Sequence, residues 1–185
     1  MNRSSFPIRV PKPVAAVALA GFLAWGCGGD GPTEPAPVSL PDLFGPELYR
    51  ADGSVVGVEV LGDVALIGVY FASPECPACG GFTPALIDAY QELRSQGKSF
   101  EVVLVSLGSG SSMFDHMTDS NMPWLAVPSP STTANALVHR YDVRWIPTLV
   151  VIDGSAKIVT TTGREDLSVR GVEAYDDWLA ASSGS

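Results

Sequence analysis

The sequence predicts an α/β fold in which helices cover a central β-sheet. Two nearly continuous apolar runs, at 65–71 and 100–107, are typical of strands buried on both faces. Apolar residues recur at helical spacing between these runs and again near the C-terminus. The chain of 185 residues is long enough for one domain with a sizeable core. Strands that alternate with helices in this way favour an α/β sandwich.

The first 26 residues have the pattern of a secretory signal peptide. Basic residues precede an apolar run at 14–25, and no acidic residue occurs before Asp30. The run is shorter than the ~20 apolar residues of a transmembrane helix. It ends at Gly26-Cys27, which resembles the cleavage site of a bacterial lipoprotein, although Ala24 stands where Leu is preferred. We expect a lipid on Cys27; the alternatives are an ordinary cleaved signal and an uncleaved anchor.

Residues 27–41 are expected to form a disordered tether, because Gly and Pro dominate and no hydrophobic period is present. The folded domain is expected over 42–182. The chain has 11 basic and 20 acidic residues, for a net charge of -9, and loss of the signal would remove only positive charge. Such an acidic chain is not expected to bind nucleic acid, which requires basic patches.

The elements of the folded domain follow one another in a simple order. A short strand at 55–60 is followed by the buried strand at 65–71, a helix at 82–96 and the second buried strand at 100–107. Next come a short helix at 113–119, an extended piece at 124–127 and a helix at 132–141. The turn Asp153-Gly154 joins strands at 148–152 and 158–162 into a hairpin. An amphipathic helix at 166–181 closes the chain, with Val172, Tyr175, Trp178 and Leu179 on its inner face.

The chemistry of the chain is expected at Cys76-Pro77-Ala78-Cys79, where the first buried strand leads into the first helix. In open α/β sheets, functional sites lie at the carboxyl ends of the strands. Two intervening residues place both sulfurs on the first turn of the helix, whose N-terminus lowers the pKa of the first thiol. The Cys76 thiolate can attack a disulfide, and Cys79 can then resolve the mixed disulfide.

Two other interpretations of this cysteine pair are weaker. A zinc site needs four ligands, and only His116 and His139 could complete it, without zinc-finger spacing. A purely structural disulfide would close too short a loop to constrain the unfolded chain much. We therefore expect no metal, and no cofactor other than the redox-active Cys76–Cys79 disulfide. Both histidines are interpreted as surface or helix-packing residues.

The segment 71–84, FASPECPACGGFTP, resembles the active-site segment of the tryparedoxin and nucleoredoxin branch of the thioredoxin superfamily. Segments at 100–103, 122–125 and 146–149 are also typical of that branch. The resemblance implies a thioredoxin fold, a three-layer α/β/α sandwich with a central mixed β-sheet. The roles that it implies are a nucleophile at Cys76, a resolving thiol at Cys79, a cis-proline at Pro147, a partner for the substrate backbone at Ile146, a helix kink at Pro84, and Tyr70 in place of a buried Asp.

Three positions depart from that family around the substrate groove. Glu75 stands directly before the first Cys, where the family has Trp, and Leu107 stands at the end of the next strand, where the family has a second Trp. Gly80 follows the second Cys, where the family often has Arg or Lys. A carboxylate beside Cys76 disfavours its thiolate, so we expect a reductant or an enzyme of modest potential. Trp145, next to Ile146-Pro147, is expected to border the substrate surface.

The expected function is that of a thiol–disulfide oxidoreductase, a disulfide reductase or isomerase that acts on exported proteins. We expect the protein to be a monomer in the bacterial cell envelope, in contact with the membrane only through the lipid on Cys27. A membrane electron donor is expected to reduce its disulfide after each cycle. Two alternatives stay open. One is a redox partner dedicated to a single client process, such as cytochrome maturation. The other is a binding module of thioredoxin fold that holds clients without turnover.

Overall fold

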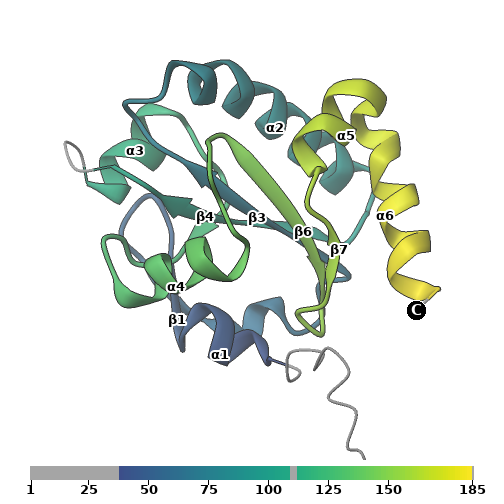
Figure 1. The fold of residues 1–185 in the computed structure, drawn as a ribbon, viewed down its shortest axis with the longest axis horizontal. Coiled ribbons are helices and arrows are strands. Elements are labelled where there is room, and N and C mark those ends of the chain that lie inside the picture. The colour runs from purple at the N-terminus through teal and green to yellow at the C-terminus, as the bar shows by residue number, and fades with distance from the viewer. Residues whose placement is uncertain (1–37, 109–111, 185) are drawn as a thin grey trace, which may run out of the picture. The chain divides into compact units, whose positions relative to one another are not determined.

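The computed structural model describes residues 38–108 and 112–184, which contain a mixed sheet of seven strands (Figure 1). The strand order is β2-β1-β5-β4-β3-β6-β7. The predicted signal peptide, Cys27 and most of the predicted tether lie outside the described residues. No helix within the described ranges has the length and apolar character needed to cross a membrane.

The elements have the following bounds. The strands are β1 Glu47–Tyr49, β2 Val55–Gly57, β3 Leu66–Ala72, β4 Phe100–Ser106, β5 Leu125–Ala126, β6 Thr148–Asp153 and β7 Ile158–Thr160. The α-helices are α1 Leu40–Phe44, α2 Pro77–Ser95, α3 Met113–Asp119, α4 Thr132–Arg140, α5 Gly163–Arg170 and α6 Ala174–Ser183. Two 3-10 helices are η1 Val58–Leu61 and η2 Gly171–Glu173.

The centre of the sheet is the pair of buried strands that the apolar runs predicted. Every residue of β3 is buried, and β3 pairs with β4 in parallel. On its other side β3 pairs antiparallel with β6, with Tyr70 opposite Leu149 and Phe71 opposite Thr148. The sheet is therefore mixed, as expected, and the beginning of β6 lies beside the end of β3.

Two layers of helices cover the sheet, which gives the three layers of the predicted sandwich. The core on one face contains side chains of α2, α3, α5 and α6, and the core on the other face contains side chains of α1, η1 and α4. Figure 1 shows α2 and α3 above the sheet, with α1 and α4 below it. Helix α2 carries the cysteine pair on the first of these faces.

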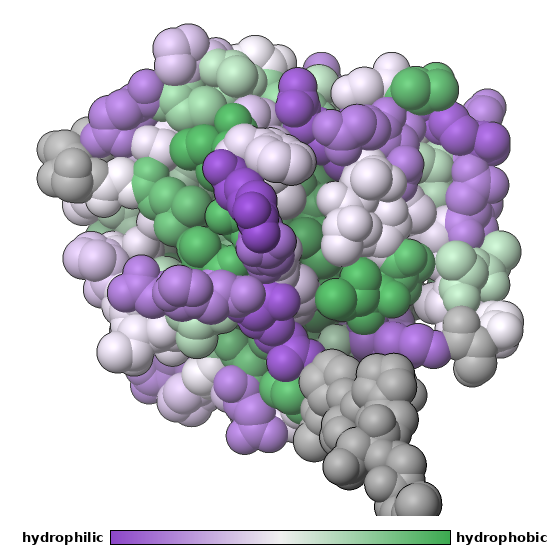
Figure 2. Space-filling model, viewed as in Figure 1, coloured by the Kyte–Doolittle hydropathy of each residue, from purple (hydrophilic) through white to green (hydrophobic). Residues whose placement is uncertain are grey.

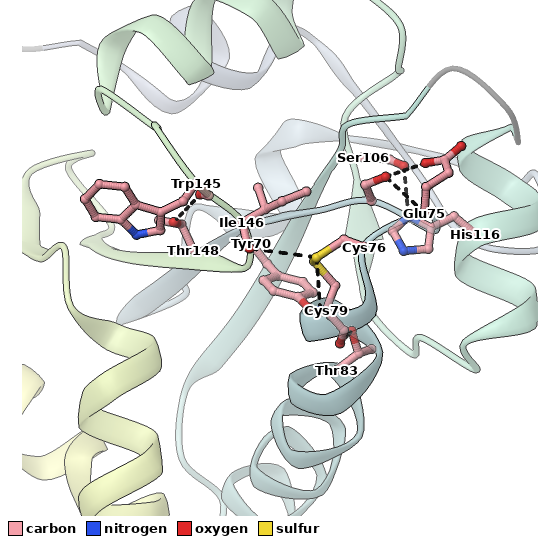
Figure 3. The surroundings of a disulfide bond; sticks show 11 residues. Tyr70, Glu75, Cys76, Cys79, Thr83, Ser106, His116, Trp145, Ile146 and Thr148 are labelled. Carbon is pink, nitrogen blue, oxygen red and sulfur yellow. Dashed lines mark hydrogen bonds between the residues drawn. A yellow bond between two sulfur atoms is a disulfide. The ribbon is translucent and has the colours of Figure 1, made fainter.

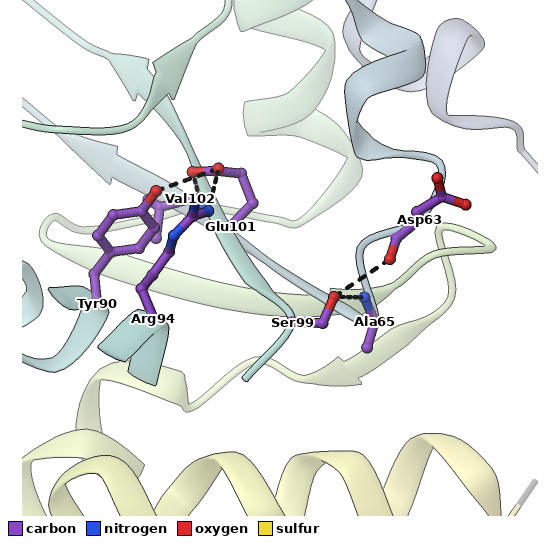
Figure 4. A network of polar contacts seen from close by, with 7 residues as sticks. All are labelled: Asp63, Ala65, Tyr90, Arg94, Ser99, Glu101 and Val102. Carbon is purple, nitrogen blue, oxygen red and sulfur yellow. Dashed lines mark hydrogen bonds and ion pairs between the residues drawn. The ribbon is translucent and has the colours of Figure 1, made fainter. Parts of the chain in front are cut away.

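A polar cluster joins α2 to β4 at the end distant from the cysteines. Tyr90 and Arg94 both point from α2 toward Glu101 of β4 (Figure 4). The Glu101 carboxylate also accepts a hydrogen bond of 2.9 Å from the Val102 N–H. Burial raises the pKa of Glu101, and hydrogen bonds from Val102 and Tyr90 oppose that rise. Nearby, the Ser99 hydroxyl accepts a hydrogen bond from the Ala65 N–H, which fixes the entry to β3.

Several boundaries differ from the sequence-based expectations; the helix predicted from residue 82, for example, begins at Pro77. The predicted tether at 27–41 extends too far, because Ser39 caps α1 and Leu40 is buried. The predicted strand at 55–60 ends at Gly57, and Val58 and Leu61 are then buried by one turn of η1.

The closing helix differs as well. It is divided at Gly171, whose φ of 58° lies in the left-handed region and interrupts the helical path. Leu179, expected on the inner face, is exposed.

Candidate active site

Cys76 and Cys79 lie on the first turn of α2 and form a disulfide. Cys76 is the N-cap residue, and Pro77 occupies the first helical turn, where a missing N–H costs nothing. The Cys79 N–H donates a hydrogen bond of 3.1 Å to Cys76 Sγ. Cys79 is only 1% exposed, whereas Cys76 is half-buried and Ala78 is exposed. The helix N-terminus and this N–H both favour negative charge on Cys76 in its reduced form.

The loop before β6 forms the opposite wall of the site. The Ile146–Pro147 peptide bond is cis, as the resemblance implied, and Pro147 is buried. The Ile146 carbonyl oxygen lies 3.7 Å from Cys76 Sγ. This contact joins residues 70 positions apart, and the antiparallel register of β3 with β6 creates it. Figure 3 shows Ile146 next to the cysteine pair, with Trp145 on one side of Cys76 and Glu75 on the other.

A buried chain of hydroxyl groups lies beneath the disulfide. The Thr83 hydroxyl donates to the Cys79 carbonyl at 2.8 Å, so the Tyr70 hydroxyl is the donor in its 2.8 Å bond to Thr83 Oγ1. Burial raises the pKa of Tyr70 to about 12, against smaller opposing effects of Thr83 and Arg164. Tyr70 is therefore a neutral hydrogen-bond donor at physiological pH.

Sequence reasoning gave Thr83 no role, although its position could have suggested one. It follows Cys79 by four residues and so lies on the same side of the helix. The next residue, Pro84, lies inside α2 and lacks the N–H that would complete the helical ladder. A side-chain bond from Thr83 to the Cys79 carbonyl reinforces the turn that carries the buried sulfur.

Glu75 is exposed, but its carboxylate is held by a neighbour. It accepts a short hydrogen bond from the Ser73 hydroxyl, and that hydroxyl accepts one of 3.2 Å from the Glu75 N–H. Figure 3 shows the carboxylate pointing away from the two sulfurs. A Cβ at Gly108 would lie 2.6 Å from Glu75 Oε2, so this arrangement needs glycine there.

The two histidines of the chain lie in different environments. His116 is buried in α3 and shares a hydrogen bond of 2.9 Å with the Ser106 hydroxyl through Nδ1. Burial lowers the pKa of His116, and the nearby Glu75 charge opposes this. His139 is exposed on α4. Within the described ranges, neither histidine forms a hydrogen bond with a sulfur, and no group of three or more His, Cys, Asp or Glu side chains could hold a metal ion.

Trp145 lies on the side of Cys76 opposite Glu75 (Figure 3), and Arg164 lies in α5. Trp145 is 70% exposed, and its carbonyl accepts a 2.8 Å hydrogen bond from the Thr148 hydroxyl. Arg164, at the start of α5, lies over the Phe82 ring at 6.0 Å and within 3.8 Å of Glu165. The Arg164 side chain therefore packs on Phe82 while part of it stays exposed to solvent.

Comparisons with known proteins agree with this geometry. Residues 63–158 match the family model described as thioredoxin-like. The chain is 41% identical over 110 residues to probable nucleoredoxin 3 of Arabidopsis thaliana, covering 59% of this chain and 28% of that protein. It is 34% identical over 132 residues to nucleoredoxin of Bos taurus, and the match covers 71% of this chain and 30% of that protein. The chain thus spans less than a third of these relatives.

Solved structures give the same result over most of their length. Native tryparedoxin I from Crithidia fasciculata is 36% identical, with a TM-score of 0.61 over 72% of this chain and 90% of that one. A thioredoxin from Wuchereria bancrofti is 33% identical, with a TM-score of 0.63 over 75% and 97%. The thioredoxin fold is confirmed, and so is the resemblance inferred from the motifs. The chain belongs to the thioredoxin-like family, in the group that contains the nucleoredoxins and tryparedoxins.

Proposed function

We propose that this chain is a thiol–disulfide oxidoreductase that reduces or isomerises disulfides of exported proteins through Cys76 and Cys79. The difference between the two sulfurs is the observation that supports this most directly. Cys76 lies at the open end of α2, and Cys79 is 1% exposed one turn further along. A client disulfide can therefore reach only the first sulfur, while the second stays within reach of it.

The reaction begins with the dithiol form. The Cys76 thiolate attacks one sulfur of the client, a Cys76–client bond forms, and the other client sulfur leaves and takes up a proton. The Cys79 thiolate then attacks Cys76 Sγ, and the second client sulfur leaves in the same way. The client gains two electrons, and the protein ends in the disulfide form that the structure contains. A dithiol donor, which we place at the membrane, must supply two electrons for the next cycle.

Several groups assist these steps. The Cys79 N–H, 3.1 Å from Cys76 Sγ, stabilises the attacking thiolate. The Ile146 carbonyl and Pro147 form the wall against which a client segment can lie. Tyr70 and Thr83 hold the turn of α2 that carries Cys79.

Insulin reduction with dithiothreitol as donor tests the proposal. Wild-type protein should accelerate precipitation of the insulin B chain, and Cys76→Ser should reduce the rate to the uncatalysed level. Cys79→Ala is the matched variant, because it should form mixed disulfides with clients and fail to release them. Equal rates for wild type and Cys76→Ser would show that the proposed function is wrong.

The direction of electron flow is proposed from Glu75. A carboxylate near Cys76 disfavours the thiolate and so disfavours an oxidising enzyme. Because Glu75 is exposed and its carboxylate, bonded to Ser73, points away from the sulfurs, we expect a small effect on the potential. Glu75→Gln should make the redox potential slightly more oxidising. A wild-type potential at the strongly oxidising end of the family range would contradict the assignment as a reductant.

Export and lipid attachment are proposed from the first 27 residues alone. Wild-type protein should incorporate a labelled fatty acid and sediment with membranes, and Cys27→Ser should do neither while keeping its redox activity. Identical fractionation and labelling of the two proteins would contradict a lipid anchor at Cys27.

A further inference from the structure

Trp145 is an aromatic side chain exposed at the edge of the active site. The other two tryptophans of the described residues, Trp124 and Trp178, are 1% and 3% exposed, while Trp145 is 70% exposed. Its backbone is held by the Thr148 hydroxyl, and its neighbour Ile146 has its carbonyl oxygen 3.7 Å from Cys76 Sγ. The backbone that carries the exposed indole is therefore held close to the reacting sulfur.

A hollow of about 380 Å³ lies beside this indole. Trp145, Pro147, Leu149 and the threonines of the β7–α5 connection contribute to its walls. This volume is at the lower end of the range for small-molecule pockets, and it is large enough for an amino-acid side chain. In the view of Figure 2, hydrophilic residues form a band over α4 and the loop that leads to β6, with apolar surface on both sides.

The charged groups at the hollow are paired within the protein. Arg144 contacts Asp142 at 2.9 Å, and Arg164 contacts Glu165 at 3.8 Å. These pairs leave little net charge to attract an ion. The indole face then offers its apolar surface to a neutral side chain, and aromatic partners gain most from such contact.

The proposed chemistry defines what can occupy this position. During turnover the client is bonded to Cys76 Sγ, and each residue of an extended client segment advances ~3.3 Å. Client residues within three positions of its cysteine can therefore reach Trp145. Because Glu75 lies on the opposite side of Cys76, only one flank of the client cysteine faces the indole (Figure 3).

We propose that Trp145 and the adjoining hollow form a subsite for an apolar or aromatic side chain on one flank of the client cysteine. This proposal rests on the proposed redox function and adds a substrate preference to it. Trp145 is then a specificity-determining residue, which selects among polypeptides without taking part in sulfur exchange.

The test uses symmetrical disulfide dimers of a short peptide with a single cysteine. Phe replaces Ser in turn at each of the three positions on either side of that cysteine. Single-turnover rates are measured with the pre-reduced full chain, by acid quenching and separation of the peptide monomer. Wild type should react about tenfold faster when Phe is on one flank only, as expected for one well-placed aromatic contact.

Three variants and one small disulfide separate the outcomes. Trp145→Ala should lose the tenfold preference, Trp145→Phe should retain most of it, and Val169→Ala, at a position 84% exposed on α5, should match wild type. All four proteins should reduce 2-hydroxyethyl disulfide equally. No preference in wild type, or an unchanged preference in Trp145→Ala, overturns the subsite but leaves the redox function intact. Failure of all four on 2-hydroxyethyl disulfide overturns both.

Discussion

The hydroxyl chain beneath the disulfide makes a quantitative prediction about coupling between Tyr70 and Thr83. Tyr70 is 0% exposed and Thr83 is 4% exposed, so neither hydroxyl can exchange its partner for water. Thr83→Val keeps the shape of the side chain but removes both hydrogen bonds. It leaves the Tyr70 hydroxyl buried without a partner, which costs about 1–3 kcal/mol in addition to the lost bond to Cys79.

The other variants complete a double-mutant cycle. Tyr70→Phe removes one hydrogen bond and should cost about 1 kcal/mol, because the Thr83 hydroxyl still donates to the Cys79 carbonyl. In the double variant no hydroxyl is left unpaired, so its total cost should be well below the sum of the single costs. We expect an interaction energy of about 1–2 kcal/mol between the two positions.

Urea unfolding of the four oxidised proteins, followed by tryptophan fluorescence, measures this energy. The disulfide must be intact in every sample, and equal m-values are needed for the comparison. Costs that add to within about 0.5 kcal/mol would show that the two hydroxyls are not coupled, and would refute the assigned hydrogen-bond chain.

Three further predictions concern pH and packing. Burial raises the pKa of Glu101 above its ordinary value of 4.5, so the folded state binds this proton more tightly than the unfolded state does, and the protein loses stability as the pH rises above 4.5. The Glu101→Gln variant should therefore become more stable relative to wild type as the pH is raised to neutral. A difference in stability that does not change with pH would contradict this. Burial lowers the pKa of His116 below 6.5, so stability is lost as pH falls below 6.5, and His116→Gln should flatten the decline toward about pH 5.5 in pH-dependent urea unfolding. A Cβ at Gly81 meets nothing within 4 Å, whereas one at Gly68 lies 3.0 Å from Leu149 Cδ1. Gly81→Ala should therefore stabilise by about 0.5–1 kcal/mol and Gly68→Ala should destabilise by about 1–3 kcal/mol, and shifts of equal sign in thermal unfolding would contradict this.

The central part of the fold could be predicted from the sequence because its signals are local and strong. The apolar runs that became β3 and β4 have no interpretation other than burial, and the helical period before Gly97 marks α2. By contrast, α1 has five residues and β1 has three, too few to show a period. Such short elements form because the surrounding core holds them, and a single sequence does not reveal that.

The site could be predicted in part for the same reason. The cysteine pair and Pro147 belong to motifs, and the structure has the cis bond that the resemblance implied at Pro147, with the Ile146 carbonyl 3.7 Å from Cys76 Sγ. The orientation of Glu75 was not predictable, because it depends on Ser73 and on the space at Gly108. Thr83 was missed because its importance arises from two tertiary contacts rather than from its residue type.

The antiparallel pairing of β3 with β6 has a consequence for how the chain acquires reactivity. Both cysteines precede β6 in the sequence by about half the length of the folded domain. The wall opposite them, formed by Ile146 and Pro147, takes its place only after β6 has paired with β3. A shift of one residue in this pairing would move Ile146 by ~3.3 Å and turn every β6 side chain to the opposite face. A chain that has not yet paired β6 therefore has both thiols but lacks this wall, so the proposed recognition of a client requires completed folding.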